Sequence, residues 1–211
     1  RTTVSGKLHF IGADQNHGFE ERLTNDIYPT DFSWTPSWGD EQLLGDYFRT
    51  STSDLRDAGI AETSVQLEFD REVADRAVAK LMDIGTTRDH EPYCLIASFT
   101  HPHDPFVIPK QYWDRYSESK IQLPRQRTFS PESRDAHSAR LFELYGFDDL
   151  SLSDKETKRI RQAYYGAISF IDDQIGKLIA TLEITNLFEN TIVIFVSDHG
   201  EMLGERGMWF K

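Results

Sequence analysis

The chain of 211 residues is long enough to bury one sizeable core, and 38% hydrophobic with 27% charged residues is the composition of a folded protein rather than a disordered one. Its 35 acidic residues outnumber the 23 basic ones, and the net charge of -12 disfavours nucleic acid and anionic membranes as partners. The single cysteine, Cys94, excludes an intrachain disulfide and a thiolate metal cluster.

The N-terminal sequence RTTVSGKLHF has neither the charged and apolar regions of a signal peptide nor an initiator methionine, so we expect upstream sequence to exist. Nowhere do about eighteen apolar residues follow one another, and no contact with a membrane is expected. One cysteine agrees with a cytoplasmic location, and a periplasmic one stays open. A homo-oligomer also stays open.

The first 60 residues form short runs separated by glycine and proline. In S-G-K-L-H-F, Lys7 and His9 alternate and would point the same way along an extended segment, where they could receive an oxyanion. The alternative is an exposed lysine and a packed histidine. Trp34 and Trp38, in DFSWTPSW, either form an aromatic wall for a cation or pack under a loop.

A helix is predicted from Asp70 to Ile84, because apolar residues recur there at intervals of three and four. The apolar run YCLIASF follows and predicts a short buried strand. Directly after it, HPHDPF supplies His101, His103 and Asp104, which are either site residues or members of a loop stiffened by proline. Residues 101–152 show no long periodic segment and predict a functional insertion or a surface excursion.

A second helix is predicted from about Ser153, where S-D-K-E forms a capping box, to about Thr185. The run TIVIFVS then predicts a second buried strand. Two pairs of helix and strand predict an α/β fold, a layered sheet with helices on both faces. In such sheets ligands bind beyond the carboxyl ends of the strands, where both predicted strands end in polar residues.

The second predicted strand ends at Asp198, His199 and Gly200. A carboxylate oxygen and an imidazole nitrogen suit a divalent cation that has further oxygen ligands. The alternative is a plain turn, for which Gly200 supplies the backbone freedom.

These motifs, in this order, resemble the sulfatases of the alkaline phosphatase superfamily. The resemblance consists of G-K-x-H, a strand followed by P-H-x-P, and an apolar strand ending in S-D-H-G with a lysine eleven residues beyond that glycine. It is closest to the choline sulfatases, whose segments are similar to SGKLHFIGADQNHGFEERLTNDIYPTDFSW, SFTHPHDPF and SDHGEMLGERGMWFK. It extends from residue 5 to residue 211.

The resemblance implies a role for each matching residue. Asp198 and His199 would ligate a divalent metal, calcium in most of these enzymes or manganese in some, that binds the sulfate oxygens. Lys7 and Lys211 would neutralise the oxyanion, a role that fits a reaction catalysed by positioning and electrostatics. His9 would act on the covalent intermediate and His103, rather than His101, on the leaving oxygen. Trp34 would face the trimethylammonium group of the substrate.

The resemblance also implies a formylglycine nucleophile, made from a C/S-x-P/A-x-R motif that this sequence lacks. We therefore expect residues 1–211 to be an internal part of one catalytic domain, inactive alone, with the nucleophile segment upstream and a further subdomain downstream. Where choline sulfatases carry a His-Asn pair, this chain has Thr50 and Ser51. The expected activity is hydrolysis of a small sulfate ester. A phosphonate monoester or phosphodiester hydrolase and a non-catalytic relative are the alternatives.

Overall fold

The computed structural model describes residues 1–27, 52–87 and 91–211. Contacts divide the chain into two compact units, each described by itself. Unit 1 comprises Arg1–Thr35, Thr63–His101 and Ile168–Phe195, and unit 2 comprises Pro36–Glu62, Pro102–Ala167 and Val196–Lys211. Among the helices of the described ranges, none is both long and apolar enough to cross a membrane.

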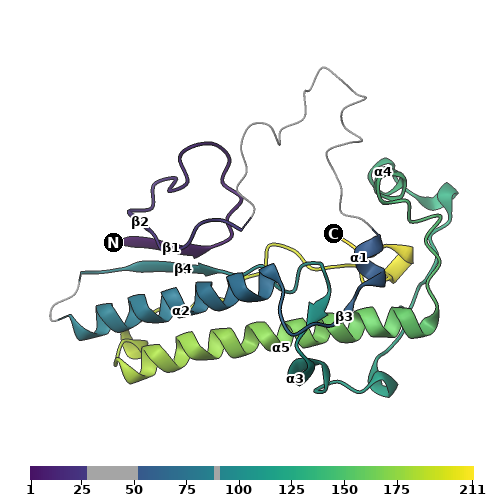
Figure 1. Cartoon of the computed structure of the whole chain (residues 1–211). Helices are drawn as coiled ribbons and strands as arrows, with labels where there is room; N and C mark the ends of the chain where they lie inside the picture. The colour runs from purple at the N-terminus through teal and green to yellow at the C-terminus, as the bar shows by residue number, and fades with distance from the viewer. Residues whose placement is uncertain (28–51, 88–90) are drawn as a thin grey trace. The chain divides into compact units, whose positions relative to one another are not determined.

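Unit 1 contains a parallel sheet of three strands in the order β2-β1-β4 (Figure 1). Strand β1 (Thr2–Gly6) lies in the middle, between β2 (Glu21–Arg22) and β4 (Cys94–Ser98). The register of β1 on β4 runs from Thr2 opposite Cys94 to Gly6 opposite Ser98. The parallel sheet confirms the predicted α/β class, and β4 confirms the strand predicted from YCLIASF.

Gly6 ends β1 with a φ of +116°, and a side chain there would run into the carbonyl oxygen of Ser98. Only glycine combines this backbone conformation with so close an approach of two strands. The sequence after β1 therefore leaves the strand at a point that is set by Gly6, immediately before Lys7.

Helix α2 (Val65–Thr86) packs on β1 and β4 and is longer than the predicted helix from Asp70 to Ile84. It begins five residues earlier because the side chain of Ser64 accepts a hydrogen bond from the backbone N–H of Leu67 and caps the first turn. Its buried face consists of Leu67, Asp70, Val73, Ala74, Ala77 and Leu81. Met82, which the predicted apolar face included, is 43% exposed.

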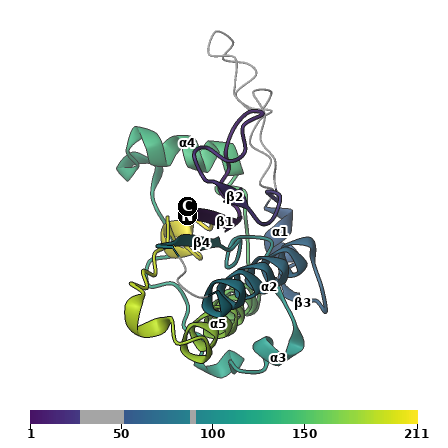
Figure 2. The same ribbon diagram turned by 90° about the vertical axis from the view of Figure 1, so that its left-hand side faces the viewer.

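Helix α5 (Asp154–Ile184) matches the predicted second helix. The capping box is confirmed, because the N–H of Ser153 donates to Glu156 and the N–H of Glu156 donates to the Ser153 hydroxyl. Its C-terminal part belongs to unit 1 and runs beside α2 (Figures 1 and 2). There Leu182 packs with Leu81 and with Leu187, which lies just before the 3-10 helix η5 (Phe188–Asn190).

Unit 2 is built from short elements around one aromatic-rich core. Ile160, Ala163 and the rings of Phe106, Phe142, Phe147, Trp209 and Phe210 belong to this core. Residues 101–152, expected to contain no long periodic segment, carry no helix longer than the ten residues of α4 (Ala136–Tyr145). Besides the N-terminal part of α5, the elements of unit 2 are α1 (Ser53–Arg56), β3 (Gly59–Ile60), β5 (Val107–Ile108), α3 (Lys110–Trp113), η3 (Glu118–Lys120), η4 (Pro131–Ser133), α4 (Ala136–Tyr145) and η6 (Glu205–Gly207).

The prediction of a buried strand at TIVIFVS is wrong. Residues 191–197 have no strand structure, and Ile192, Ile194 and Phe195 are exposed. An apolar run becomes a buried strand only where neighbours supply ladder hydrogen bonds and cover both faces, and no strand of the described residues pairs with this run. Burial of YCLIASF was also predicted too broadly, because β4 lies at the edge of its sheet and leaves Cys94 exposed.

Candidate active site

The loop after β4 holds the side chains of His103 and Asp104 against each other in unit 2. The ring Nδ1 of His103 lies 2.9 Å from Oδ1 of Asp104 and 3.0 Å from the carbonyl oxygen of the same residue. Both side chains are mostly covered, with exposed fractions of 20% and 10%. Two oxygens facing Nδ1 require the hydrogen of the ring to be on that nitrogen, which leaves the lone pair on Nε2.

Lys211 meets that second ring nitrogen. Its Nζ lies 2.9 Å from Nε2 of His103, although 108 positions separate the two residues. The chain returns here through a tight turn, in which the N–H of Leu203 donates to the carbonyl of Trp209. The ring of Phe106, two positions after Asp104, stacks with the ring of Phe210, next to Lys211, and their centroids are 6.4 Å apart. The aromatic core of unit 2 thus brings the two segments together.

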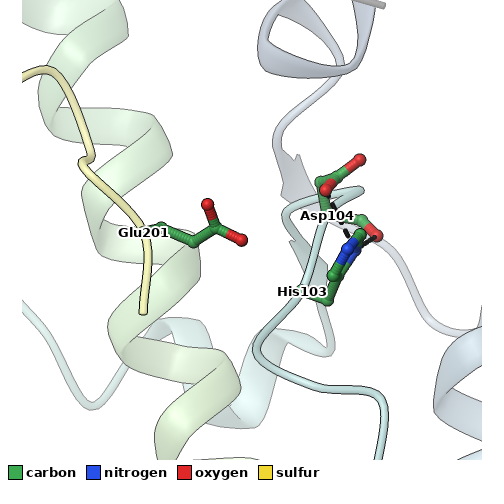
Figure 3. Close-up of side chains that lie close together, drawn as sticks. All are labelled: His103, Asp104 and Glu201. Atoms are coloured by element: carbon green, nitrogen blue, oxygen red, sulfur yellow. Dashed lines mark hydrogen bonds and ion pairs between the residues drawn. The ribbon is translucent and has the colours of Figure 1, made fainter. Parts of the chain in front are cut away.

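Glu201 adds a second carboxyl group to this cluster, and it points towards His103 and Asp104 (Figure 3). Burial raises the pKa of Glu201 to about 7, although the positive charges of His103 and Lys211 act in the opposite direction. The carboxyl of Asp104 behaves differently. Burial alone would raise its pKa, but the hydrogen bond and charge of His103, with the charge of Lys211, outweigh burial and lower it.

His103, Asp104 and Glu201 each offer a ligand atom within 4.8 Å of the others, a spacing at which a metal ion could be shared. The lone pair of His103, however, faces the Lys211 ammonium, and a metal in that position would meet a positive charge. The arrangement therefore fits a network of two carboxyls, an imidazole and an ammonium better than a metal centre.

Asp198 and His199 form a separate pair of candidate metal ligands in unit 2. Oδ2 of Asp198 lies 3.3 Å from Nε2 of His199, and Nδ1 of His199 lies 3.1 Å from the carbonyl oxygen of Gly200. A hydrogen on Nδ1 would be donated to that carbonyl, which leaves an unprotonated nitrogen 3.3 Å from a carboxylate oxygen. This is the second contact that metal-binding histidines use to orient the ring, and the pair fits a divalent cation.

The two sets of residues are neighbours. The rings of His103 and His199 lie with centroids 6.4 Å apart in an edge-on arrangement. Four residues that sequence analysis nominated therefore gather in unit 2, namely His103, Asp198, His199 and Lys211. Glu201 was missed, and its only sequence signal was an acidic residue two positions beyond His199.

Lys7 and His9 belong to unit 1, in the loop that follows β1. The expectation that they alternate along an extended segment is wrong, because β1 ends at Gly6 and His9 has a φ of +52°. The loop is held instead by Asp26, whose carboxylate accepts hydrogen bonds from the backbone N–H groups of Leu8 and His9. His9 is exposed, as a residue acting on a ligand requires.

His101 has a different environment from His103. It is buried in unit 1, where its Nδ1 lies 2.6 Å from Asp70, a carboxylate on α2. Asp70 also accepts hydrogen bonds from the backbone N–H groups of Thr100 and His101. His101 therefore stabilises the turn that ends β4, and His103 is the histidine of this loop with solvent access. Trp34, Thr50 and Ser51 lie outside the described residues.

A cavity of about 490 Å³ opens beside the cluster in unit 2. Its lining includes the charged residues Glu201, Arg206 and Lys211 together with apolar side chains and residues of α4. The other lining residues are Phe129, His137, Ser138, Leu141, Gly200, Met202, Arg206 and Met208. The cavity gives a ligand of a few heavy atoms access to Lys211.

The chain is similar in sequence to known sulfatases. The chain is 42% identical to "Choline-sulfatase" of Rhizobium meliloti (strain 1021), over 100% of the chain and 42% of that protein. It is 34% identical to "Arylsulfatase" of Clostridium perfringens (strain 13 / Type A), over 64% of the chain and 27% of that protein. The chain thus spans less than half the length of these relatives.

The fold is shared with phosphonate monoester hydrolases of known structure. That of Agrobacterium radiobacter superposes with a TM-score of 0.60 at 20% identity, covering 100% of this chain and 47% of the other. That of Silicibacter pomeroyi gives 0.57 at 20% identity, over 92% and 40% of the two chains. At this identity the likeness establishes the alkaline-phosphatase-like fold alone. The family description "Sulfatase" matches residues 1–211, and the chain belongs to the sulfatase family.

Proposed function

We propose that the protein containing this chain is a sulfuric ester hydrolase that cleaves choline sulfate, or a related small alkyl sulfate, to the alcohol and sulfate. The observation that carries the proposal is the contact between Lys211 Nζ and His103 Nε2, beside the Asp198 and His199 pair. Lys211 suits an oxyanion and His103 suits a leaving oxygen. The Asp198 and His199 pair suits a metal. The relative named for choline sulfate supports the substrate class.

Sulfatases generally use a divalent metal. In this proposal Asp198 and His199 hold it, with calcium as the metal and manganese as the alternative. When bound, the metal withdraws negative charge from the sulfate oxygens and so favours attack at sulfur. The side chain of Asp198 is exposed, so its carboxylate is accessible to a metal ion that has further ligands besides this pair.

The remaining roles belong to basic residues. Lys211 and Lys7 would bind sulfate oxygens and stabilise the charge that develops on them. His103 would protonate the leaving oxygen, and His9 would assist release of the bound sulfate. Trp34 would face the cationic group of the alcohol. The nucleophile is proposed to be a formylglycine, which supplies an activated oxygen, and its motif is not part of these 211 residues.

The test measures released sulfate from choline sulfate and from para-nitrophenyl sulfate by the full-length protein, supplied with calcium or manganese. The para-nitrophenol released from para-nitrophenyl phenylphosphonate and from bis(para-nitrophenyl) phosphate is measured in parallel. Sulfate from choline sulfate supports the proposal, and sulfate from the aryl ester alone would refute the alkyl substrate. Release of para-nitrophenol from these two phosphorus esters without sulfate release would favour the phosphonate or phosphodiester alternative. No product from any of the substrates would favour a non-catalytic relative.

Two variants separate the proposed roles. Asp198→Ala should lose bound metal and activity together. Lys211→Ala should keep the metal and lose turnover about 100-fold or more, because its proposed partner is the sulfate. Asp114→Ala, which removes an exposed pair with Lys110 in the same unit, is the matched control and should change neither metal content nor turnover. Equal metal loss in the first two variants would contradict the division of roles.

A further inference from the structure

Asp104 has no role in the reaction proposed above, yet it makes a close polar contact with His103. Its carboxylate and its own carbonyl oxygen both face Nδ1, at 2.9 Å and 3.0 Å. Neither oxygen can donate a hydrogen, because the carboxylate is ionised and the carbonyl has none. The hydrogen of the neutral ring must therefore be on Nδ1.

Lys211 provides an independent observation on the same ring. Its ammonium group can only donate, and it lies 2.9 Å from Nε2. Nε2 must therefore be the acceptor in the neutral ring. Both contacts specify one tautomer, and they come from segments about a hundred residues apart. They also direct Nε2, and no other atom of the ring, towards the lysine proposed to bind sulfate.

We infer that Asp104 is a positioning residue, which orients the His103 ring so that Nε2 exchanges the proton with the leaving oxygen of the sulfate ester. This inference rests on the proposed function. His103 enters this step with a hydrogen on each ring nitrogen, the one on Nε2 having been taken up from solvent. As the bond between sulfur and the leaving oxygen breaks, its electron pair stays on that oxygen, which takes the proton from Nε2. His103 then returns to the neutral form with the hydrogen on Nδ1, held by Asp104.

The charge of Asp104 serves the same purpose. A protonated His103 beside the Lys211 ammonium would place two positive charges in contact, and the adjacent carboxylate offsets one of them. The lowered pKa of Asp104 keeps this carboxylate ionised at neutral pH, despite its burial. A carboxamide would keep the shape of the side chain and lose the charge.

The inference predicts a dependence on the leaving group. An alkyl alcohol leaves as a strongly basic oxyanion and needs protonation as the bond breaks, whereas para-nitrophenolate is stable without it. Loss of the oriented acid should therefore slow hydrolysis of alkyl sulfates much more than that of aryl sulfates. A general loss of folded enzyme would slow both equally.

The experiment compares the kcat/KM of the full-length protein for choline sulfate with that for para-nitrophenyl sulfate, in the presence of the metal. The ratio of the two values does not depend on the fraction of active enzyme. His103→Gln should lower the ratio about 100-fold, and Asp104→Asn about tenfold. Asp114→Asn, an exposed aspartate of the same unit, should leave it unchanged.

An unchanged ratio in Asp104→Asn with a lowered ratio in His103→Gln would overturn the inference and leave the proposed function intact. An unchanged ratio in both variants would overturn the inference together with the acid role of His103. If the wild-type protein releases no sulfate from either ester, the proposed function fails first, and the inference fails with it.

Discussion

Two histidine–carboxylate pairs lie two positions apart in the chain, and their environments differ. His101 and Asp70, in unit 1, are 2.6 Å apart and almost completely buried, with exposed fractions of 1% and 0%. His103 and Asp104, in unit 2, are 2.9 Å apart and keep exposed fractions of 20% and 10%. The distance between the partners does not distinguish the two pairs.

The second ring nitrogen distinguishes them. Nε2 of His101 is buried and has no hydrogen-bond partner within the described residues, and the ring packs edge-on against Phe170. Nε2 of His103 meets Lys211 instead. A histidine whose second nitrogen is enclosed by apolar groups stabilises a turn, whereas one whose second nitrogen meets an ammonium group beside a cavity can take part in chemistry.

The largest effect is expected from Asp70→Ala. This change removes the acceptor of three hydrogen bonds, two of them from backbone N–H groups of the buried turn, and should lower the free energy of unfolding by about 3–5 kcal/mol. Denaturant unfolding measures the loss. Asp75→Ala is the matched control on the same helix, because its pair with Lys177 is exposed and should contribute less than about 1 kcal/mol. Similar losses in both variants would contradict the structural role of Asp70.

Substituting each histidine in turn should sharpen the contrast between the two pairs. His101→Phe keeps a ring against Phe170 but leaves Asp70 without one donor, and should lower the free energy of unfolding by about 1–3 kcal/mol. His103→Gln should change it by less than about 1 kcal/mol. Thermal and denaturant unfolding should show that the first variant loses stability. The sulfate-release assay should show that the second variant loses turnover. The reverse result would mean that the two roles are assigned to the wrong histidines.

Local sequence signals were sufficient for the two long helices. The spacing of apolar residues on α2 and the capping box of α5 depend on neighbours within a few positions, so each could be predicted without the rest of the chain. The strand prediction for residues 191–197 failed because the decisive information is not local. Their apolar run specifies a preference for burial, but not a strand with which to pair.

The candidate site divides in the same way. Sequence motifs nominated His103, Lys211, Asp198 and His199, and the fold of unit 2 gathers them. The contact of Lys211 with His103 and the place of Glu201 required the structure, because they depend on the stacking of Phe106 on Phe210 and on the turn that pairs Leu203 with Trp209. For Lys7 and His9 the assumption of an extended segment failed at Gly6, where the backbone leaves the strand.

The smallest effect concerns the pH dependence of the His103 pair. Because the pKa of Asp104 is lower in the folded protein than its ordinary value of 3.8, its ionised form stabilises the fold. This contribution is present above the unfolded pKa and is lost as the pH falls through the lowered folded pKa. Asp104→Asn should therefore lower the free energy of unfolding at pH 7 by less than about 1 kcal/mol, and the difference from wild type should disappear in acid.

Melting temperatures of wild type and Asp104→Asn between pH 7 and pH 3 would measure that difference, with Asp114→Asn as the exposed control. His103 and Lys211 are the charges that lower the pKa of Asp104, so Lys211→Met should reduce the effect of Asp104→Asn at neutral pH. A difference that persists unchanged to pH 3 would show that Asp104 contributes through packing rather than through charge. The pair would then resemble His101 and Asp70 in its role, and the contrast between the two pairs would rest on Lys211 alone.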